Sequence, residues 1–383
     1  MRIATQPWAP ASAPHHPVAL EVLLNGPISR SDIARRLGLS AGSLTRLSTP
    51  LIESGLLVES GARIEGSRGR PSVLLDIVPE SRHFIGIKLT GDGVLGVVTD
   101  LRASVIASAF SPLESHEPDL VVGVIGALVT NLAAQVPRVT ALGVGVGGLV
   151  SDRRVVRAAP FLAWTNVDLG TALETLTGLP TVVENDLTAF TEYERWFGAG
   201  RNLDRFAVLT LGAGVGYGLV AGGEVATDVD AGIGLVGHWP LDPFGAVCAS
   251  GHRGCAQSVL TTSAIVQGVS AALGRPVGYE EALDLARDGE PGARRVVDDA
   301  GRGLGRLMAA VANLTMPELI ILGGEGVGLV QVAGTSIEEG LALDRDARTR
   351  RIPVITTSGD DTEWCRGAAV LAIQTYVLGT NAG

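Results

Sequence analysis

The first part of the chain alternates short apolar helical stripes with residues that begin and end helices. Residues 17–24 are mostly apolar, and the Asn-Gly-Pro sequence at 25–27 predicts the end of that helix. Ser29 and Ser40 are favourable N-cap residues for two further helices, and Gly38 between them suits a left-handed C-cap. The pattern therefore predicts three short helices, of which the second and third are joined by a tight turn.

The third of these helices has the layout of a recognition helix. Its apolar residues form a stripe that is expected to be buried, whereas its first turns carry small or polar side chains. In a helix-turn-helix motif, the second helix of the motif enters the major groove of DNA by its N-terminal residues. We therefore expect DNA contacts from Ser40, Ser43, Thr45 and Arg46.

Two apolar stretches around a turn rich in Arg and Gly come next. Residues 56–58 and 73–75 predict strands, and the turn between them carries Arg68 and Arg70. Such a hairpin is typical of a wing whose arginines contact phosphates or enter a minor groove. The alternative is a three-helix interaction domain with a solvated Arg loop, but the helix lengths, turn and caps together favour DNA binding.

From residue 84 the pattern changes to that of an α/β protein. Residues 84–101 and 206–223 each predict two strands joined by a Gly-rich turn, and helices and buried strands follow each of them. The further expected elements are a helix over 120–135, a strand over 141–150, helices near 260–273 and 293–313, and a strand over 319–324. Two α/β halves that each open with a hairpin are typical of the two-lobed fold of sugar kinases and actin, which is ribonuclease H-like.

The glycine patterns favour this fold over a doubly wound dinucleotide-binding fold. Glycine supplies 51 of the 383 residues, and the excess lies in short clusters between apolar runs. No G-x-G-x-x-G stands between a first strand and a helix, because GAGVGYG lies inside the second hairpin. The phosphate-loop pattern G-x-x-x-x-G-K-[ST] is also absent, since the chain has one lysine, Lys88.

Charge and cysteine content restrict the compartment and the partners. The net charge of −10 at first argues against binding to nucleic acid. Residues 1–75, however, carry eight arginines and five acidic residues, so the excess negative charge lies in residues 76–383. Three cysteines and a start without an apolar signal core predict a reducing, cytoplasmic location. No apolar run reaches the roughly 20 residues that a membrane span needs, so no membrane partner is expected.

Six segments, in this order along the chain, resemble the motifs of one protein family. They are VVENDLTAF, ERWFGAG, LTLGAGVGYGLV, GLVGH, the C…GHRGC segment and PELIILGG. Their order and spacing are similar to those of the ROK family (repressors, open reading frames and sugar kinases), and the resemblance extends over nearly the whole chain. The helix-turn-helix pattern in front of them is typical of the repressor branch.

The resemblance implies altered catalytic and sugar-binding groups. Asp186 matches the family's catalytic base and Asn185 a sugar hydroxyl ligand, and Lys88 stands where the kinases keep a carboxylate near the metal. We hypothesise that Lys88 pairs with Asp186 or a nearby carboxylate; the alternative is an exposed lysine at a loop edge. A second phosphate loop keeps its glycines but has Ala213 in place of Thr. The expected effector site comprises Asn185, Asp186 and His238 together with the altered positions Phe161, Leu235 and Gln257.

The resemblance also implies a structural zinc site with one ligand replaced. The matching positions here are His238, Cys248 and Cys255, with Ser250 where the family has a third cysteine. Because serine is a poor zinc ligand, such a site needs completion by His252, Asp242 or water. The alternative is two free thiols and a core histidine.

Together these observations predict a cytoplasmic DNA-binding regulator, expected to be a repressor of genes for carbohydrate uptake or catabolism, without ATP turnover. We expect disorder over 1–16, a winged helix-turn-helix over 17–78 and a kinase-like effector and dimerisation domain over 79–383, with lobes at about 79–186 and 187–383. A homodimer or homotetramer would suit a palindromic operator, and the implied effector is a sugar or a modified sugar. The alternatives are a regulator controlled by a protein partner and an active ATP-dependent sugar kinase.

Overall fold

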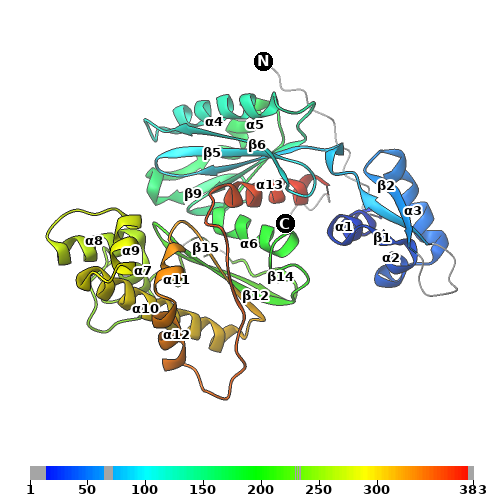
Figure 1. Cartoon of the computed structure of the whole chain (residues 1–383). Helices are drawn as coiled ribbons and strands as arrows, with labels where there is room; N and C mark the ends of the chain where they lie inside the picture. The colour runs from blue at the N-terminus through cyan, green and yellow to red at the C-terminus, as the bar shows by residue number, and fades with distance from the viewer. Residues whose placement is uncertain (1–13, 64–71, 229, 231, 233, 378–383) are drawn as a thin grey trace. The chain divides into compact units, whose positions relative to one another are not determined.

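The computed structural model of the protein describes residues 14–63, 72–228, 230, 232 and 234–377 (Figure 1). The disorder expected over 1–16 is wrong for its last three residues, because residues 14 and 15 form a turn and His16 begins the first helix. Residues 1–13 lie outside the described residues. Within the described ranges, no helix combines the length and the apolar character that crossing a bilayer requires.

The three N-terminal helices form where the capping residues predict them. They are α1 (His16–Asn25), α2 (Arg30–Leu37) and α3 (Ala41–Glu53). The side chain of Ser29 accepts a hydrogen bond from the backbone N–H of Asp32, which holds the first turn of α2. Gly38 ends α2 with φ 64°, a left-handed conformation that glycine adopts without steric cost. The turn between α2 and α3 is therefore fixed by local chemistry.

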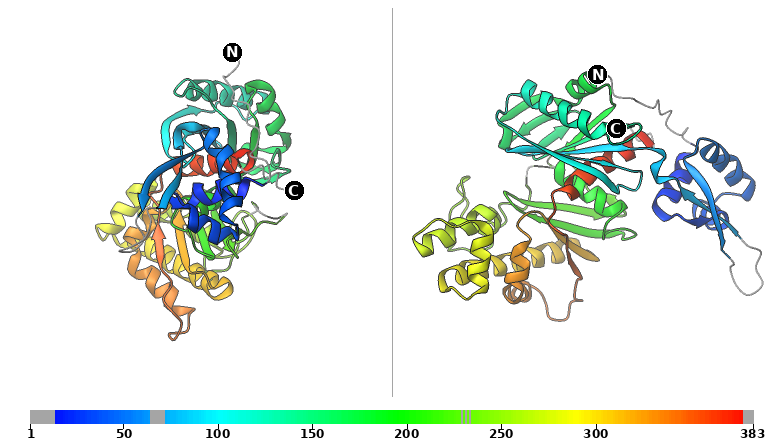
Figure 2. Two further views of the ribbon diagram at one scale, coloured as in Figure 1. Left: turned by 90° about the vertical axis from the view of Figure 1, so that its right-hand side faces the viewer. Right: turned by 45° about the horizontal axis from the view of Figure 1, so that its top comes forward.

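An antiparallel three-stranded sheet completes the N-terminal region (Figure 2). Its order is β1-β3-β2, with β1 (Ile28–Ser29), β2 (Leu57–Arg63) and β3 (Ser72–Ile77). The hairpin of β2 and β3 confirms the two strands expected there, and the short β1 was not anticipated. The turn between β2 and β3, with Arg68 and Arg70, lies outside the described residues.

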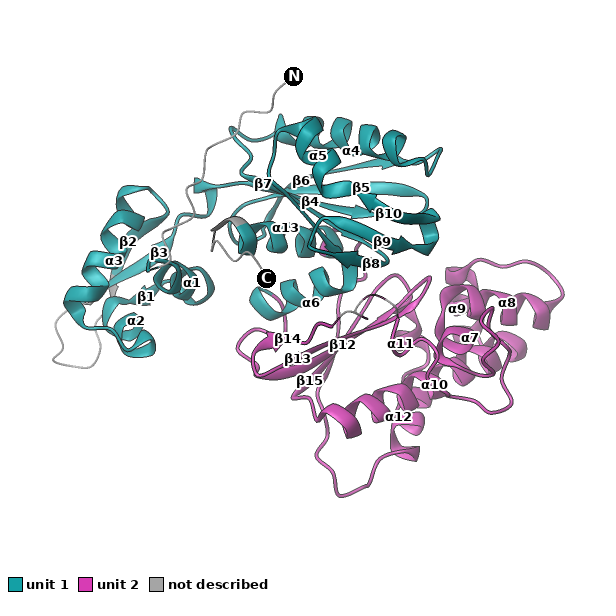
Figure 3. Cartoon of the chain, turned by 180° about the vertical axis from the view of Figure 1, so that it is seen from behind, with its two compact units in different colours: residues 1–197, 364–383 teal, residues 198–363 magenta. Residues whose placement is uncertain are grey.

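The chain packs as two compact units (Figure 3). The first comprises residues 1–197 and 364–383, and the second comprises residues 198–363. This division differs from the expected lobes, because helix α6 (Asp186–Trp196) and nearly all of the last helix, α13 (Thr362–Val377), belong to the first unit.

A five-stranded sheet of order β11-β7-β4-β5-β6 forms the centre of the first unit. The strands are β4 (Phe84–Leu89), β5 (Gly93–Thr99), β6 (Val105–Pro112), β7 (Ala141–Val146) and β11 (Thr181–Asn185). Helices α4 (Pro118–Ala133) and α5 (Leu169–Thr177) pack with it in one apolar cluster, which includes Ile87, Ile125 and Leu173. A smaller antiparallel sheet contains β8 (Leu149–Ser151), β9 (Val155–Ala159) and β10 (Trp164–Asp168), and the 3₁₀ turns are Pro79–Ser81 and Pro160–Leu162.

Helix α13 approaches this sheet more closely than side chains would allow. A Cβ on Gly86 would lie 1.9 Å from the carbonyl oxygen of Cys365, and a Cβ on Gly143 would lie 1.8 Å from that of Ala368. Because neither glycine has a side chain, the backbone of α13 packs directly against the backbone of β4 and β7.

The single strand expected over residues 141–150 is wrong in its second half. β7 ends at Val146, and β8 belongs to the smaller sheet. The break falls at Gly147 and Gly148, and a Cβ on Gly148 would lie 2.1 Å from the carbonyl oxygen of Ala158. The close approach of β9 explains both the glycine and the change of sheet.

The second unit contains a five-stranded sheet of order β14-β13-β12-β15-β16 with helices packed against it. Its strands are β12 (Arg205–Leu211), β13 (Val215–Ala221), β14 (Glu224–Val225), β15 (Leu319–Gly323) and β16 (Val354–Thr356). Its helices are α7 (Ala256–Leu260), α8 (Thr262–Leu273), α9 (Tyr279–Arg287), α10 (Pro291–Thr315), α11 (Gly328–Val332) and α12 (Gly334–Leu343). The hairpin of β12 and β13 and the parallel pairing of β12 with β15 confirm the repeated α/β half.

Candidate functional site

The first turns of α3 are held by local hydrogen bonds. Ser40 accepts from the backbone N–H of Ser43 at 3.1 Å, and the two hydroxyls lie 2.9 Å apart. The Thr45 hydroxyl donates to the carbonyl oxygen of Ala41 at 3.0 Å. These side chains are exposed or half-buried, so they remain accessible while they stabilise the helix start.

Arg46 differs from the arginines of α2, which are Arg30, Arg35 and Arg36 and all have partners. Its side chain is exposed and has no hydrogen bond or ion pair within the described part of the chain. Arg30, by contrast, donates to Ser48 at 2.9 Å and to Glu59 at 2.8 Å, which ties α2 to α3 and β2. Arg36 pairs with Glu21 at 2.8 Å. The positive charge of Arg46 is therefore available to an external anion.

Lys88 and Asp186 form an ion pair in the first unit. Their side chains are only 13% and 15% exposed. The Lys88 Nζ also lies 4.2 Å from the centroid of the Trp364 ring, which packs against Phe190. The pairing agrees with the hypothesis drawn from the sequence. Trp364 was missed, because a tryptophan in an apolar C-terminal helix gives no sign of contact with a cation.

Asn185 has a structural role at the start of α6. Its side-chain oxygen accepts hydrogen bonds from the backbone N–H groups of Leu187 at 3.0 Å and Thr188 at 3.1 Å. Its amide nitrogen donates to the carbonyl oxygen of Gly148 at 3.0 Å. The side chain is buried, and both its oxygen, in capping α6, and its nitrogen, on Gly148, already have partners within the protein.

Phe161 lies beside the same ion pair. A Cβ built on Gly147 would contact the Asp186 carboxylate at 3.5 Å and the Phe161 ring at 3.7 Å, so both side chains border this glycine. The Phe161 side chain is 57% exposed. An exposed aromatic ring therefore lies near the Asp186 carboxylate.

The other expected effector residues lie in the second unit. Gln257 donates from Nε2 to the carbonyl oxygen of Ala213 at 3.3 Å, and its backbone N–H donates to Gly237 at 2.6 Å. Leu235 is exposed and apolar. His238 lies with the cysteines, as described next. Gln257 thus supports the loop between β12 and β13.

Two cysteines and two histidines cluster in the segment between β14 and α7. The Cys248 sulfur lies 3.7 Å from the Nδ1 atoms of both His238 and His252, and the Cys255 sulfur lies 3.7 Å from Nδ1 of His238. The ligand atoms of His238, Cys248 and His252 lie within 4.8 Å of one another. The donor set is of the type that structural zinc prefers.

His252, rather than Asp242, joins this cluster. Asp242 accepts from the backbone N–H of Phe244 at 2.9 Å and so stabilises a local turn. Desolvation would raise the pKa of the Cys248 thiol, but hydrogen bonds from the side chain and backbone of His252 and the backbone of Ser250 outweigh it and lower the pKa to about 7. A thiol of this kind is readily available as a thiolate ligand.

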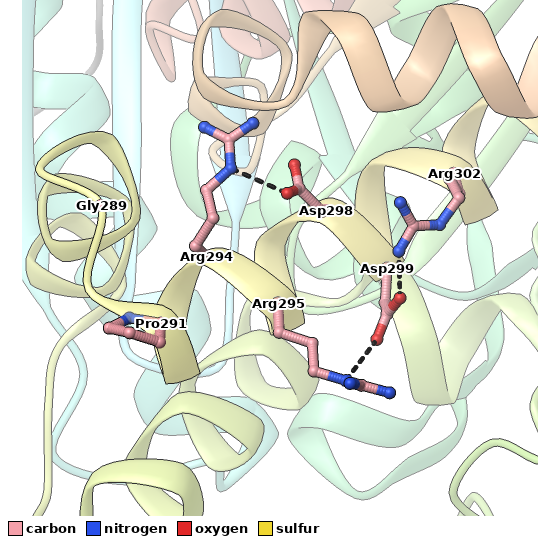
Figure 4. Close-up of a pocket in the computed structure, with 7 residues that line it drawn as sticks. All are labelled: Gly289, Pro291, Arg294, Arg295, Asp298, Asp299 and Arg302. Atoms are coloured by element: carbon pink, nitrogen blue, oxygen red, sulfur yellow. Dashed lines mark hydrogen bonds and ion pairs between the residues drawn. The ribbon is translucent and has the colours of Figure 1, made fainter.

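A groove on α10 is lined by paired charges (Figure 4). Arg294 donates to Asp298 at 2.7 Å, and Asp299 accepts from Arg302 and lies 4.0 Å from Arg295. Asp299 is shared by two of the three arginines, and Arg302 also lies 3.6 Å from Glu339, so the carboxylates around the groove balance its positive charge. We interpret it as a solvated helix face.

Comparison with known proteins gives matches over most of the chain. Residues 84–375 match the family model described as ROK family. The chain is 24% identical to the xylose repressor of Bacillus subtilis (strain 168) over 306 residues, which cover 79% of this chain and 79% of that repressor.

Solved structures of both regulators and kinases resemble this chain. A ROK family transcriptional regulator, described as a homologue of the Escherichia coli MLC protein, superposes with a TM-score of 0.83 and 27% identity, covering 97% of this chain and 98% of its own. A ROK family glucokinase from Streptomyces griseus, in complex with glucose and AMPPNP, gives a TM-score of 0.65 and 25% identity, covering 76% of this chain and 98% of its own. The likeness to the regulator thus includes the N-terminal region.

Proposed function

Because the chain belongs to the ROK family, we propose that it is a DNA-binding transcriptional regulator, a repressor of genes for carbohydrate uptake or use. The observation that carries this proposal is the capped, exposed helix α3 with the unpaired charge of Arg46 among the described residues. The likeness to a ROK transcriptional regulator over 97% of the chain supports it.

We propose that α3 lies in the major groove and that Arg46 reads a base edge. Arginine forms two parallel hydrogen bonds with guanine, and such a contact contributes about 1–3 kcal/mol of discrimination. Ser40, Ser43 and Thr45 are proposed to contact DNA beside it, and Arg68 and Arg70 of the wing to contact phosphates or the minor groove. Two copies in a homodimer or homotetramer would read a palindromic operator in the cytoplasm.

The ROK domain is proposed to have no phosphoryl transfer activity. A catalytic base must be free to accept the proton of the attacking hydroxyl, and the transferred phosphate needs a metal ion beside it. The largely buried pairing of Asp186 with Lys88 opposes both requirements, since it occupies the carboxylate and adds a positive charge that repels Mg²⁺. The alternative, an active sugar kinase, is therefore disfavoured.

The proposed effector is a sugar with few free hydroxyls or a modified sugar. The xylose repressor is named for its sugar, and this chain is similar to it along most of its length. However, Asn185 is used in capping α6, and Phe161 and Leu235 present apolar surface. A partner protein in place of a sugar is the second candidate, favoured by the exposed Phe161 ring and the exposed Leu235 side chain.

A structural zinc ion is proposed at His238, Cys248, His252 and Cys255. Two cysteines and two histidines form one of the common tetrahedral zinc sites. The short distances among these four side chains support the proposal, and His252 would replace the ligand lost at Ser250. Zinc there would hold the segment between β14 and α7 in one conformation.

Selection from a library of random duplexes, with the full chain as bait, tests the proposed function. We expect an inverted repeat to be enriched, because two recognition helices related by a two-fold axis read half-sites about 10 base pairs apart or a multiple of that. Failure to enrich any sequence would contradict DNA recognition. In parallel, a coupled ATP-consumption assay over a sugar panel tests for kinase activity, which we expect to be absent.

A further inference from the structure

The glycine-rich loop between β12 and β13 has a carboxylate bound to it. In the second unit, the backbone N–H of Ala213 donates to Oε1 of Glu325 at 2.7 Å. A Cβ built on Gly212 would lie 2.2–2.3 Å from the carboxylate atoms of the same side chain. The negative charge of Glu325 therefore lies directly against the loop that resembles a phosphate-binding loop.

The remaining polar groups of Gly212 and Ala213 also have partners inside the unit. The N–H of Gly212 donates to the carbonyl oxygen of Gly214 at 3.0 Å, and the carbonyl of Gly212 accepts from the N–H of Thr262 at 3.0 Å. The carbonyl of Ala213 accepts from Gln257 at 3.3 Å. The N–H of Ala213 is thus a donor whose acceptor is a side chain, and that acceptor is anionic.

The backbone holds Glu325 in this place. Glu325 stands between two glycines in the turn after β15, and both of them approach the end of β12. A Cβ on Gly324, which has φ 89°, would lie 2.4 Å from the carbonyl oxygen of Leu211. Gly326 donates its N–H to the same oxygen at 2.8 Å and accepts from the Tyr279 hydroxyl at 2.7 Å. The turn is fixed to β12, so the carboxylate starts from a rigid backbone.

We propose that Glu325 is an internal substitute for a phosphate group and that it excludes the phosphate chain of a nucleotide from the Gly212–Gly214 loop. An anion that approaches this loop would find the Ala213 N–H already bonded to Glu325. The carboxylate would also repel the anion at close range. The similar glucokinase was solved with AMPPNP, so a ROK domain can hold such a phosphate chain. The inference goes beyond DNA binding, which does not depend on it.

This exclusion is separate from the ion pair of Lys88. Lys88 and Asp186 belong to the first unit, whereas Glu325 and its loop belong to the second. Removal of Glu325 is therefore expected to restore binding of phosphate groups without restoring their transfer. Binding and turnover are different measurements, so the two effects can be told apart.

The experiment measures binding of two probes, AMPPNP with Mg²⁺ and inorganic triphosphate with Mg²⁺, to the full chain by titration calorimetry. Glu325→Gly and Glu325→Ala both remove the carboxylate, and Glu325→Ala does so without creating a run of four glycines over residues 323–326. We expect each variant to bind at least one probe about tenfold or more tightly than the wild type. Triphosphate reports the loop alone, and AMPPNP reports the loop together with any nucleoside contact.

Glu318→Ala is the matched control. Glu318 also accepts hydrogen bonds from backbone N–H groups in the same unit, those of Asp204 and Arg205 at 3.1 Å, but at the opposite end of β12. It should therefore leave the affinity for both probes unchanged. A gain in the Glu318 variant equal to that in the Glu325 variants would overturn the proposal. So would wild-type binding as tight as that of the variants, or folded Glu325 variants that gain nothing for either probe. None of these results would alter DNA recognition.

Discussion

Replacing Lys88 by methionine tests the largely buried ion pair of the first unit. The substitution keeps much of the aliphatic stem but leaves Asp186 without its cation, in a place where the carboxylate is only 15% exposed. Removing one partner of a buried pair typically costs about 3–5 kcal/mol, whereas an exposed pair contributes about 0–1 kcal/mol. Because Asp186 lies in the first turn of α6, the helix dipole still favours its charge by about 0.3–1 kcal/mol, so we expect the lower end of that range.

Thermal and denaturant unfolding of the full chain measure this cost. A loss of about 3 kcal/mol corresponds to a fall in melting temperature of roughly 6–12 °C in the transition that contains the first unit. A double-mutant cycle with Asp186→Asn isolates the pairwise term, because the double variant removes both charges together. We expect the double variant to be more stable than Lys88→Met alone.

Arg275→Met provides the matched control, since Arg275 pairs with Glu281 at 2.8 Å with side chains 50% and 46% exposed. That variant should change stability by less than about 1 kcal/mol. A Lys88→Met protein that melts within 1 °C or so of the wild type, with a coupling energy near zero, would refute the reasoning. The pair would then be no more than an exposed contact.

Three further predictions follow from other parts of the molecule. Gly143→Ala should destabilise the protein by about 3 kcal/mol or more in chemical denaturation, because the new Cβ would lie 1.8 Å from a backbone oxygen of α13. The control, Gly123→Ala, adds a Cβ in open space on α4 and should be neutral or stabilising by up to about 1 kcal/mol. Protein purified without added metal should carry near one equivalent of zinc per chain by elemental analysis, and the His252→Ala variant should lose its zinc to a chelator faster than the wild type. Less than a tenth of an equivalent in the wild type would count against the site. Arg46→Ala should reduce discrimination between the selected operator and random duplex by about 1–3 kcal/mol in fluorescence anisotropy, and equal loss on both DNAs would speak against base reading.

The N-terminal helices could be predicted because their signals are local. Ser29, Gly38 and Ser40 act on the backbone within three residues, so their effect does not depend on distant packing. The two hairpins of the body were predicted for the same reason, since alternation and a Gly-rich turn are also local.

The break after β7 and the membership of α13 in the first unit could not be predicted in this way. Gly148 is required by the approach of Ala158, and Gly143 by the approach of a helix more than 200 positions later in the chain. A glycine in a strand pattern indicates that something comes close without indicating what comes close.

The candidate site was predictable only where a motif named its residues. The His and Cys cluster follows from the motif, and His252 was one of three options that the sequence left open. Glu325 and Trp364 had no sequence signal, because their partners Ala213 and Lys88 are far away along the chain. Their roles depend on contacts that the fold creates.

The most direct test of the central claim is the ratio of dissociation constants for the selected operator and a scrambled duplex of the same length. It is measured by fluorescence anisotropy with the full chain at about 0.15 M salt, since phosphate contacts depend strongly on ionic strength. If the protein is a sequence-specific regulator, it should bind the operator about 1,000-fold or more tightly than the scrambled duplex. A ratio close to one, at the same salt and with folded protein, would contradict the account.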